Sequence, residues 1–453
     1  MAREMKDSGI EWIGEIPKEW ELIRMKACIL QRNSGAWGNE ANGTEGDVIC
    51  LRIADFNYPM FKFKDTDEEL LTKRNYNASI IEDLLLHKGD ILIEKSGGGE
   101  KTPVGRTVIF DKSYRAVYAN FCDRLRCKKI ILPQFMQYIF VTFYTNRYIW
   151  NYIKQTTGIQ NLDLTAMLAS ERIALPSIIE QQRIVNSLNT YCTELDNVLE
   201  KTRASIEEYK KLKQAVITQA VTKGIRGDRE MKDSGVEWIG TIPTEWGLIP
   251  FRHVLKERQE KNSPIKSVER LSLSIDLGVT LYAEKTTNLD RFKDDFEQYK
   301  LAYEGDLVMN SMNMIVGATG VSDYFGCVSP VYYTFYDELE DHVTAKYCEY
   351  IFRSKTMLRV LYSLGKGIYA IVRGDDRVNT CRLKVSKEDL KSIIIPVPPV
   401  EEQREIVNYL KKKCLAIDEL IAKKEQYLSE IENYKKSLIY EYVTGKKEVP
   451  QNC

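Results

Sequence analysis

The feature that most constrains this chain is an internal duplication. Residues 5–20 return as residues 231–246 with 13 of 16 positions identical, which chance does not produce. Residues 180–222 likewise align without a gap to residues 402–444. The blocks between these repeats differ from each other in sequence and in length. The chain therefore uses one frame twice, in the order motif, variable block and long segment, around two different inserts.

The long segment at residues 180–222 contains neither proline nor glycine. Its apolar and small residues recur at alternating spacings of four and three, which is the heptad pattern of a helix that packs against another helix. The seam positions are Ile184, Leu188, Tyr191, Leu195, Val198, Thr202, Ser205, Tyr209, Leu212 and Val216. Polar residues also occupy seam positions in the second copy, at Lys413 and Lys424, and such residues commonly fix helix register. We therefore expect two matched long helices.

Composition narrows the class of protein. The 453 residues include 65 Lys and Arg against 65 Asp and Glu, so an anionic partner must be bound by local patches. Ten cysteines without a C-x-x-C pair and three histidines argue against a disulfide framework and a metal site. The N-terminus is polar, and the most apolar tract, residues 130–144, is short and contains Pro133. We expect no signal peptide or transmembrane span, and a cytoplasmic protein.

Each variable block has the pattern of a mixed α and β domain. In the first block we expect strands at residues 47–56, 90–94, 106–110 and 172–175, and helices at 134–152 and 162–169. In the second block we expect strands at 270–275, 305–309 and 328–335, and a helix at 343–363. The expected parts of the chain are 1–20 (motif), 21–175 (first domain), 176–224 (long helix), 225–246 (motif), 247–396 (second domain), 397–446 (long helix) and 447–453 (tail).

Three repeated signatures resemble the specificity subunit of a Type I restriction-modification system. They are the Gly-x-Ile-Pro-x-x-Trp motifs (14–20 and 240–246), the Pro-x-x-x-Glu-Gln helix starts (176–181 and 398–403) and the Val-Thr endings (221–222 and 443–444). The resemblance covers essentially the whole chain. It departs only at Ser177, where the second copy has Pro399, and this concerns the rigidity of the helix entry.

The resemblance implies an α+β fold. Two globular target-recognition domains would be separated by two long helices that form an antiparallel coiled coil, with an internal pseudo-two-fold duplication. Each domain would read one half of a bipartite site in double-stranded DNA. The helices would set the spacing and dock two methyltransferase subunits, to which restriction and translocase subunits bind. A helix of about 43 residues is about 65 Å long, which matches about 19 base pairs of duplex.

The resemblance also implies that this chain is not an enzyme. S-adenosylmethionine, ATP and magnesium would belong to the partner subunits of a phage-defence complex in a prokaryotic cytoplasm. Independently, the sequence lacks an Asn/Asp-Pro-Pro-Tyr/Phe element for holding a flipped base and a Gly-x-x-x-x-Gly-Lys-Ser/Thr loop for a triphosphate. No catalytic residue is therefore expected.

The alternative is an enzyme that binds a nucleotide in its glycine-rich loops. Residues 96–102 superficially suggest a phosphate loop, but Glu100 separates the glycines from Lys101. Residues 365–370 fit a dinucleotide fingerprint, yet they follow a predicted helix instead of a strand. Asp90, Glu94 and Lys95 have the wrong spacing for a nuclease carboxylate cluster. Turns and a strand-end acid are the simpler interpretations.

DNA contact is expected from Arg, Lys, Asn and Gln near turns, because these side chains bind phosphates and read base edges. The loops at residues 97–102, 158–161 and 365–374 are the favoured regions. For each residue the alternative is a solvated surface side chain. The candidates are Lys95, Lys101, Arg106, Asn120, Arg124, Arg126, Gln160 and Asn161 in the first block, and Arg291, Asn310, Asn313, Lys366, Arg373 and Arg377 in the second.

Partner docking is expected at the long helices and at the tryptophans of the repeated motif. The tryptophans could equally be core residues. The candidates are Trp12, Trp20, Trp238, Trp246, Ile206, Val221, Ile421 and Tyr442.

Overall fold

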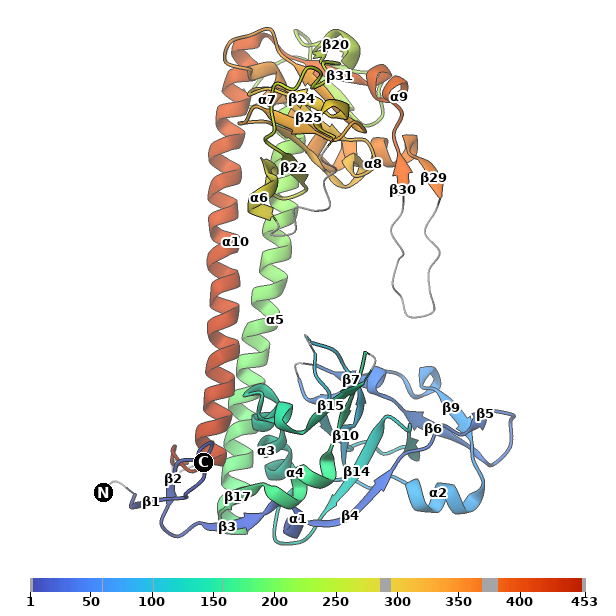
Figure 1. Ribbon diagram of the computed structural model, residues 1–453, viewed down its shortest axis with the longest axis vertical. Coiled ribbons are helices and arrows are strands. Elements are labelled where there is room, and N and C mark those ends of the chain that lie inside the picture. The colour runs from blue at the N-terminus through green and yellow to red at the C-terminus, as the bar shows by residue number, and fades with distance from the viewer. Residues whose placement is uncertain are drawn as a thin grey trace. The chain divides into compact units, whose positions relative to one another are not determined.

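The computed structural model describes residues 3–58, 60–100, 102–156, 158–285, 295–368 and 382–449. The chain divides into two compact units, unit 1 (Met1–Arg203 with Gln426–Cys453) and unit 2 (Ala204–Glu425). The long helices α5 (Ile178–Lys223) and α10 (Val400–Val443) each begin in one unit and end in the other (Figure 1). The predicted α+β architecture, with two globular domains and a pair of long helices, is confirmed.

Unit 1 contains a four-stranded antiparallel sheet in the order β12-β10-β14-β4 and a second sheet in the order β13-β6-β9-β5. Its first elements are β1 (Met5–Asp7), β2 (Glu15–Pro17), β3 (Glu21–Arg24), α1 (Met25–Cys28), β4 (Ile29–Ser34), β5 (Asn39–Glu40), β6 (Asp47–Leu51), β7 (Phe56–Asn57), β8 (Lys62–Phe63), β9 (Lys73–Asn75) and α2 (Ala78–Leu84). They are followed by β10 (Ile91–Glu94), β11 (Ser96–Gly97), β12 (Thr107–Ile109), β13 (Ala116–Tyr118), β14 (Cys122–Cys127), α3 (Pro133–Thr145), β15 (Ile153–Thr156), β16 (Ile159–Leu162), α4 (Leu164–Ser170) and β17 (Arg172–Leu175).

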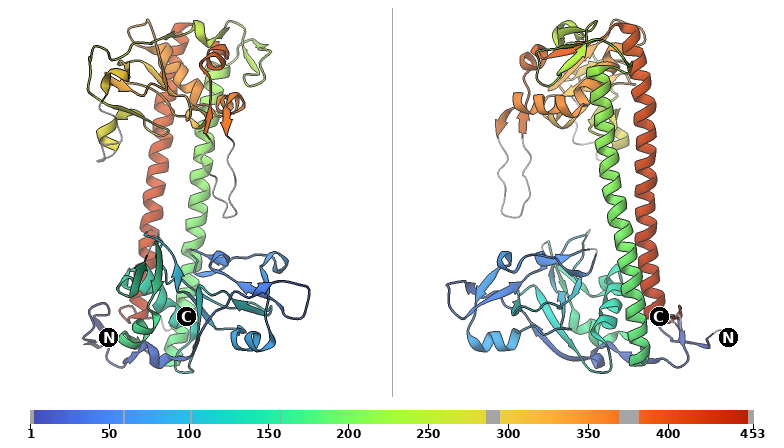
Figure 2. Two further views of the ribbon diagram at one scale, coloured as in Figure 1. Left: turned by 45° about the vertical axis from the view of Figure 1, so that its right-hand side comes forward. Right: turned by 180° about the vertical axis from the view of Figure 1, so that it is seen from behind.

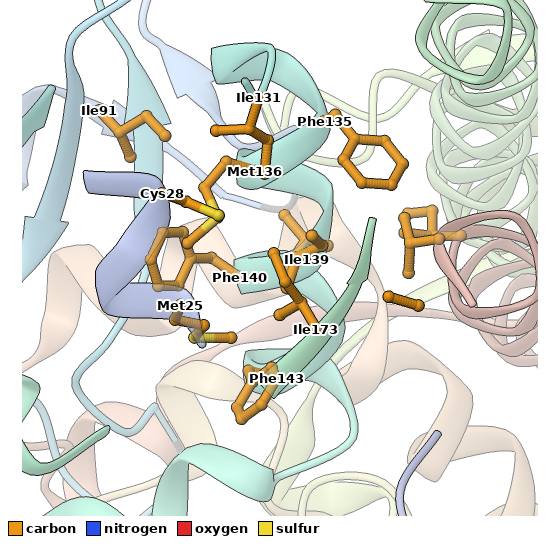
Figure 3. Packing of buried hydrophobic residues seen from close by; sticks show 14 of the residues in the cluster. Met25, Cys28, Ile91, Ile131, Phe135, Met136, Ile139, Phe140, Phe143 and Ile173 are labelled. Carbon is orange, nitrogen blue, oxygen red and sulfur yellow. The ribbon is translucent and has the colours of Figure 1, made fainter. Parts of the chain in front are cut away.

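The core of unit 1 follows from the alternation of side chains along β10. Ile91 lies in a cluster with Phe135, Ile139 and other residues of α3 (Figure 3), and Ile93 belongs to the same cluster. Leu92 belongs instead to the cluster that contains residues of β6 and β13. The central strand is thus buried on both faces. This explains why residues 91–93 form an unbroken apolar run and not an alternating one.

Unit 2 repeats this plan with other residues. Its four-stranded sheet has the order β21-β28-β25-β26, which matches β4-β14-β10-β12 of unit 1 strand for strand. The elements are β18 (Met231–Asp233), β19 (Thr241–Pro243), β20 (Gly247–Pro250), β21 (Lys256–Glu257), β22 (Leu271–Ser274), β23 (Gly278–Leu281), α6 (Tyr282–Lys285), β24 (Lys300–Ala302), β25 (Leu307–Asn310), β26 (Thr319–Val321), β27 (Gly326–Val328), β28 (Tyr332–Tyr336), α7 (Val343–Arg353), α8 (Lys355–Leu364), β29 (Lys366–Ile368), β30 (Arg382–Lys384), α9 (Lys387–Ser392) and β31 (Ile394–Val397).

The repeated motif folds in the same way in both copies. β1 pairs with β2 and β18 pairs with β19, with Met5 opposite Pro17 and Met231 opposite Pro243. Each variable block is closed by a two-stranded antiparallel sheet, β3 with β17 and β20 with β31. The duplication seen in the sequence is therefore a duplication of structure.

Within each unit, segments of α5 and α10 run side by side and antiparallel (Figure 2). In unit 1, Lys435 Nζ donates to Asp196 Oδ1 at 2.6 Å, and Tyr191 stacks on Tyr442. In unit 2, Lys213 Nζ donates to Asp418 Oδ2 at 2.6 Å. Asp196 and Asp418 are equivalent positions of the repeat, as are Lys213 and Lys435, so the two ion pairs are equivalent in the two copies of the repeat.

The buried stripe on the long helices differs from the predicted heptad seam. Val198 and Leu212 are exposed, whereas their neighbour Leu199 and the off-seam Ile206 are buried. Lys413 is also exposed, beside the buried Cys414. An uncoiled helix has 3.6 residues per turn, so its contact line drifts away from a strict 3.5-residue repeat. The seam prediction is therefore wrong at Val198, Leu212 and Lys413.

Four element boundaries also differ from the predictions by more than two residues. The strand expected at residues 47–56 ends at Leu51 and is followed by a 3-10 segment, Ile53–Asp55. The strand expected at residues 328–335 is two strands, β27 and β28, joined by a turn that contains Pro330. The helix expected at residues 343–363 breaks at Ser354, whose side chain accepts a hydrogen bond from Met357 N and caps α8. The helix expected at residues 134–152 ends at Thr145 and is followed by a 3-10 segment. Local caps and turns decide these ends.

Candidate nucleic-acid interface

Three predicted cations of unit 1 bind buried carboxylates of their own sheet. Lys95 Nζ lies 2.9 Å from Asp123 Oδ1, Arg106 Nε lies 2.6 Å from Glu94 Oε2, and Arg126 Nη2 lies 2.7 Å from Asp90 Oδ2. The three carboxylate side chains are at most 2% exposed. A buried carboxylate needs a nearby cation, so these side chains have a structural role.

The pair Glu94–Arg106 is the clearest case. Burial raises the pKa of Glu94, and the hydrogen bonds from Arg106 oppose this shift. The same hydrogen bonds raise the pKa of Arg106 against the effect of its own burial. Arg106 also lies over the Tyr58 ring, at 4.1 Å from its centroid. Both partners are therefore fixed inside the domain.

We predict that Arg106→Met reduces the stability of unit 1 without changing the DNA sequence that is recognised. Removing one partner of a buried ion pair leaves an uncompensated charge and costs about 3 kcal/mol or more. Urea unfolding would measure the loss. Lys154→Met is the matched control, because the pair of Lys154 with Asp163 is solvent-exposed and its loss should leave the unfolding midpoint nearly unchanged. A folded, fully stable Arg106→Met protein with altered DNA specificity would contradict this role.

The other candidates of unit 1 fall into two groups. Arg124 and Gln160 are each 1% exposed, Arg124 donating to Leu85 O at 3.0 Å and Gln160 accepting from Val104 N at 3.3 Å. Asn120 and Asn161 are exposed, and Asn161 accepts a hydrogen bond from Ser96 Oγ. Lys101 lies outside the described residues. Asn120 and Asn161 therefore retain surface for a ligand, whereas Arg124 and Gln160 do not.

The candidates of unit 2 are mostly polar groups at turns. Asn310 is buried, and its amide oxygen accepts from Met312 N at 3.0 Å. Asn313 is exposed at the start of a 3-10 turn. Lys366 is exposed and pairs with Asp389 at 3.0 Å. Arg291, Arg373 and Arg377 lie outside the described residues. DNA contact by the exposed candidates stays a prediction.

The tryptophans that end the repeated motif are core residues. Trp20 and Trp246 are each 1% exposed, and their Nε1 atoms donate to Glu180 Oε2 and Glu402 Oε2, both at 3.0 Å. These glutamates lie in the first turns of α5 and α10, where negative charge is favourable. Each motif is thus hydrogen-bonded to the first turn of the long helix that follows its own block.

The remaining docking candidates are mostly covered by the chain itself. Ile206, Val221 and Tyr442 are at most 5% exposed, so the expectation that they are available to partners is wrong. Trp12 and Trp238 are partly buried, with Trp12 donating to Glu171 at 3.2 Å, and Ile421 is partly exposed. The helix α10 instead exposes other apolar residues, among them Leu415 and Leu420 in unit 2 and Tyr427 and Tyr434 in unit 1.

Two cavities adjoin turns whose apolar residues, Phe121 and Val331, were not among the sequence candidates, although Asn120 and Lys366 in the cavity linings were. In unit 1 a cavity of about 440 Å³ is lined by Trp37, Arg52, Asn120 and Phe121 among others. In unit 2 a cavity of about 510 Å³ is lined by Lys300, Val331, Lys384 and Lys387 among others. An apolar residue at a turn gives no sequence signal of its own. Alignment of the strand order of the two blocks would have placed Phe121 and Val331 at equivalent positions.

The local structure also tests the nucleotide-loop alternatives. Ser96 and Gly97 form β11 and pair with Asn161 and Gln160 of β16, so this segment enters a strand pairing and not a helix. The Gly365 segment follows α8 and begins β29, the reverse of the strand-to-helix order of a dinucleotide fold. Among the described residues, no group of three or more His, Cys, Asp or Glu side chains could hold a metal ion. No helix in this part of the chain is long and apolar enough to span a membrane.

Comparison with known proteins shows which family this chain is similar to. A model of the Type I restriction modification DNA specificity domain matches residues 53–208 and 372–433. The chain is 22% identical over 443 residues to the type I restriction enzyme StySPI specificity subunit of Salmonella potsdam, covering 95% of this chain and 90% of that protein. It is 21% identical over 444 residues to the MjaVIII specificity subunit of Methanocaldococcus jannaschii, covering 96% and 94%.

The fold has been seen before. A solved chain from a study of complex assembly and conformational transition of the type I R-M system superposes with a TM-score of 0.66 at 14% identity. The alignment covers 95% of this chain and 99% of that chain. The similarity therefore extends over both units.

Proposed function

Because this chain belongs to the family of Type I restriction-modification specificity subunits, we propose that each unit reads one half of a split DNA site. The chain is a DNA sequence-specificity subunit. In our proposal unit 1 reads the first half-site and unit 2 the second, and the chemistry of the complex belongs to other subunits.

One observation carries this proposal. The two units share a sheet order, a closing strand pair and a Trp–Glu contact at the start of a long helix, yet the sequences of their variable blocks differ. A conserved frame with different variable blocks suits two recognition tasks of the same kind on different sequences. DNA recognition also commonly resides in loops on a rigid scaffold.

We further propose that the long helices set the gap between the half-sites. α5 has 46 residues and α10 has 44. A helix of that length is about 66–69 Å long, which corresponds to about 20 base pairs of duplex. The unread gap should be shorter, because each domain also covers its own half-site.

The proposed partners are two methyltransferase subunits, with restriction subunits binding to them in turn. S-adenosylmethionine, ATP and magnesium would act in those subunits. Exposed residues of α10 replace the buried candidates as the docking positions that we propose, Leu415 and Leu420 in unit 2 and, separately, Tyr427 and Tyr434 in unit 1. Apolar side chains on a solvent-facing helix are suited to packing against a partner helix.

The proposal predicts that the purified chain alone transfers no methyl group and binds DNA weakly. Its net charge is zero, so little non-specific affinity comes from phosphate neutralisation. Adding methyltransferase subunits encoded in the same genome should give S-adenosylmethionine-dependent methylation at one bipartite motif, read by sequencing the methylated DNA. Methylation, ATP hydrolysis or cleavage by the pure chain would refute the non-catalytic role. Methylation by the methyltransferase subunits at the same motif without this chain would refute its role in specificity.

A further inference from the structure

The same β-turn occurs at the equivalent place in both units. In unit 1 it joins β13 to β14, and Cys122 N donates to Ala119 O at 3.0 Å. In unit 2 it joins β27 to β28, and Tyr332 N donates to Ser329 O at 2.9 Å. The turn of unit 1 leads into β14 and the turn of unit 2 leads into β28. These strands have the same place in the two four-stranded sheets, beside β10 and beside β25. The frame thus presents one turn twice.

The third position of each turn carries an exposed apolar side chain. Phe121 is 49% exposed and Val331 is 41% exposed, although Cys122 and Val328 beside the two turns are buried. A single exposed apolar residue is common on protein surfaces. Its occurrence at one position of both copies, with different side chains, indicates a common tip whose specificity varies.

The cavity of unit 1 combines aromatic faces with hydrogen-bond donors. Trp37, which is 38% exposed, and Phe121 supply apolar surfaces, and Asn120 and Arg52 supply polar groups. The Arg52 Nε atom is buried without a hydrogen bond and lies 3.8 Å from Asp55 Oδ2, while the Arg52 side chain as a whole is 40% exposed. Arg74 lies 4.3 Å from the Trp37 ring centroid and donates to Trp37 O, which holds the indole in place. In duplex DNA, apolar side chains contact thymine methyl groups and polar side chains bond to base edges in the grooves.

The cavity of unit 2 combines its apolar tip with a cluster of lysines. Lys300 Nζ donates to Tyr332 O at 2.8 Å, and Lys384 and Lys387 line the same cavity. Burial and the charge of Lys387 lower the pKa of Lys300. Lys387 is itself paired with Glu257 at 2.6 Å. Four lysines, Lys300, Lys366, Lys384 and Lys387, thus line this cavity with one acidic residue, Glu388, and the excess of lysine complements the phosphates of nucleic acid.

The turn of unit 1 is also continuous with a loop that the sequence favours for DNA contact. Lys95 N donates to Phe121 O at 2.9 Å, and β11 follows directly at Ser96. The exposed Asn161 accepts a hydrogen bond from Ser96. The tip, the glycine-rich loop and Asn161 therefore form one connected surface.

We propose that these two turns are the base-reading tips of the protein, Asn120–Phe121 for the first half-site and Pro330–Val331 for the second. Phe121 and Trp37 make apolar contacts with base edges such as the thymine methyl group, while Asn120 and Arg52 donate to base edges. Val331 packs against a base, and Lys300 and Lys384 hold the adjacent phosphates. This inference rests on the proposed function, because it names the residues that would perform the reading.

The test uses the full chain in complex with methyltransferase subunits from the same genome, and maps methylated motifs by sequencing. Phe121→Ala should relax one or two base positions of one half-site and lower the methylation rate at the original motif about tenfold, the order of effect expected for the loss of one base contact. Val331→Glu should act on the other half-site. Its carboxylate can pair with the neighbouring lysines, so the fold is retained. The same pairing occupies the lysines that would otherwise bind the phosphate.

Matched controls are exposed leucines elsewhere on the same units, Leu70→Ala (76% exposed) and Leu277→Glu (77% exposed), which should leave the motif unchanged. As a second measurement, a duplex of the wild-type motif with 5-iodouracil in place of thymine should cross-link to the peptides that contain Trp37 or Phe121. An unchanged motif and rate for Phe121→Ala, or cross-links only to other segments, would overturn the inference. A wild-type complex that methylates no bipartite motif would instead refute the proposed function.

Discussion

Replacing Lys435 with methionine is expected to destabilise unit 1 by about 3–5 kcal/mol, because Asp196 is then left buried without its cation. The two side chains are 11% and 10% exposed, and their Nζ–Oδ1 distance is 2.6 Å. Both residues lie where α5 and α10 pack together, so the change removes the polar contact that fixes the register of the pair. Urea unfolding followed by circular dichroism would measure the loss.

The duplication supplies the control for this experiment. Lys213 and Asp418 form the equivalent pair in unit 2, but their side chains are 28% and 51% exposed. Lys213→Met should therefore cost about 1 kcal/mol or less. The double variant Asp196→Leu with Lys435→Met should recover much of the lost stability, since an apolar pair can replace a buried ion pair. Equal losses for Lys435→Met and Lys213→Met would contradict the assignment of burial as the cause.

The architecture was predictable because its signals are local and repeated. Each signal determines the structure of the residues that carry it or that follow it directly. The signals are the two copies of the motif, the prolines before the long helices and the absence of glycine or proline between residues 180 and 222. The contact line between the helices was less predictable. It depends on how far each helix departs from a 3.5-residue repeat, so Leu199 and Ile206 are buried where the seam placed Val198 and Ser205.

The candidate site was predicted less well than the fold, and the reason is long-range pairing. Lys95, Arg106 and Arg126 resemble surface cations in the sequence, but strand pairing places a buried carboxylate beside each of them. Asp123 binds Arg32 as well as Lys95, and Arg32 is distant in sequence. The tip at Phe121 was missed for the opposite reason. Apolar residues are expected inside a protein, and only the three-dimensional turn exposes this one.

Replacing residues 25–171 of the first block with residues 251–393 of the second is expected to change one half of the recognised site and leave the other intact. Both blocks end against the same frame, at β3 with β17 and at β20 with β31, so the junctions are structurally equivalent. The new protein should lose the first half-site and recognise two copies of the second. The copies should have opposite orientations, because α5 and α10 run antiparallel.

Sequencing of methylated DNA from cells that carry this chimaera with its methyltransferase subunits is the most direct test of independent reading by the two units. The account predicts a bipartite motif whose halves are inverted copies of the wild-type second half-site. The reciprocal chimaera, with the first block in both places, should give inverted copies of the first half-site. A motif in which both halves differ from the wild-type second half-site would contradict the account.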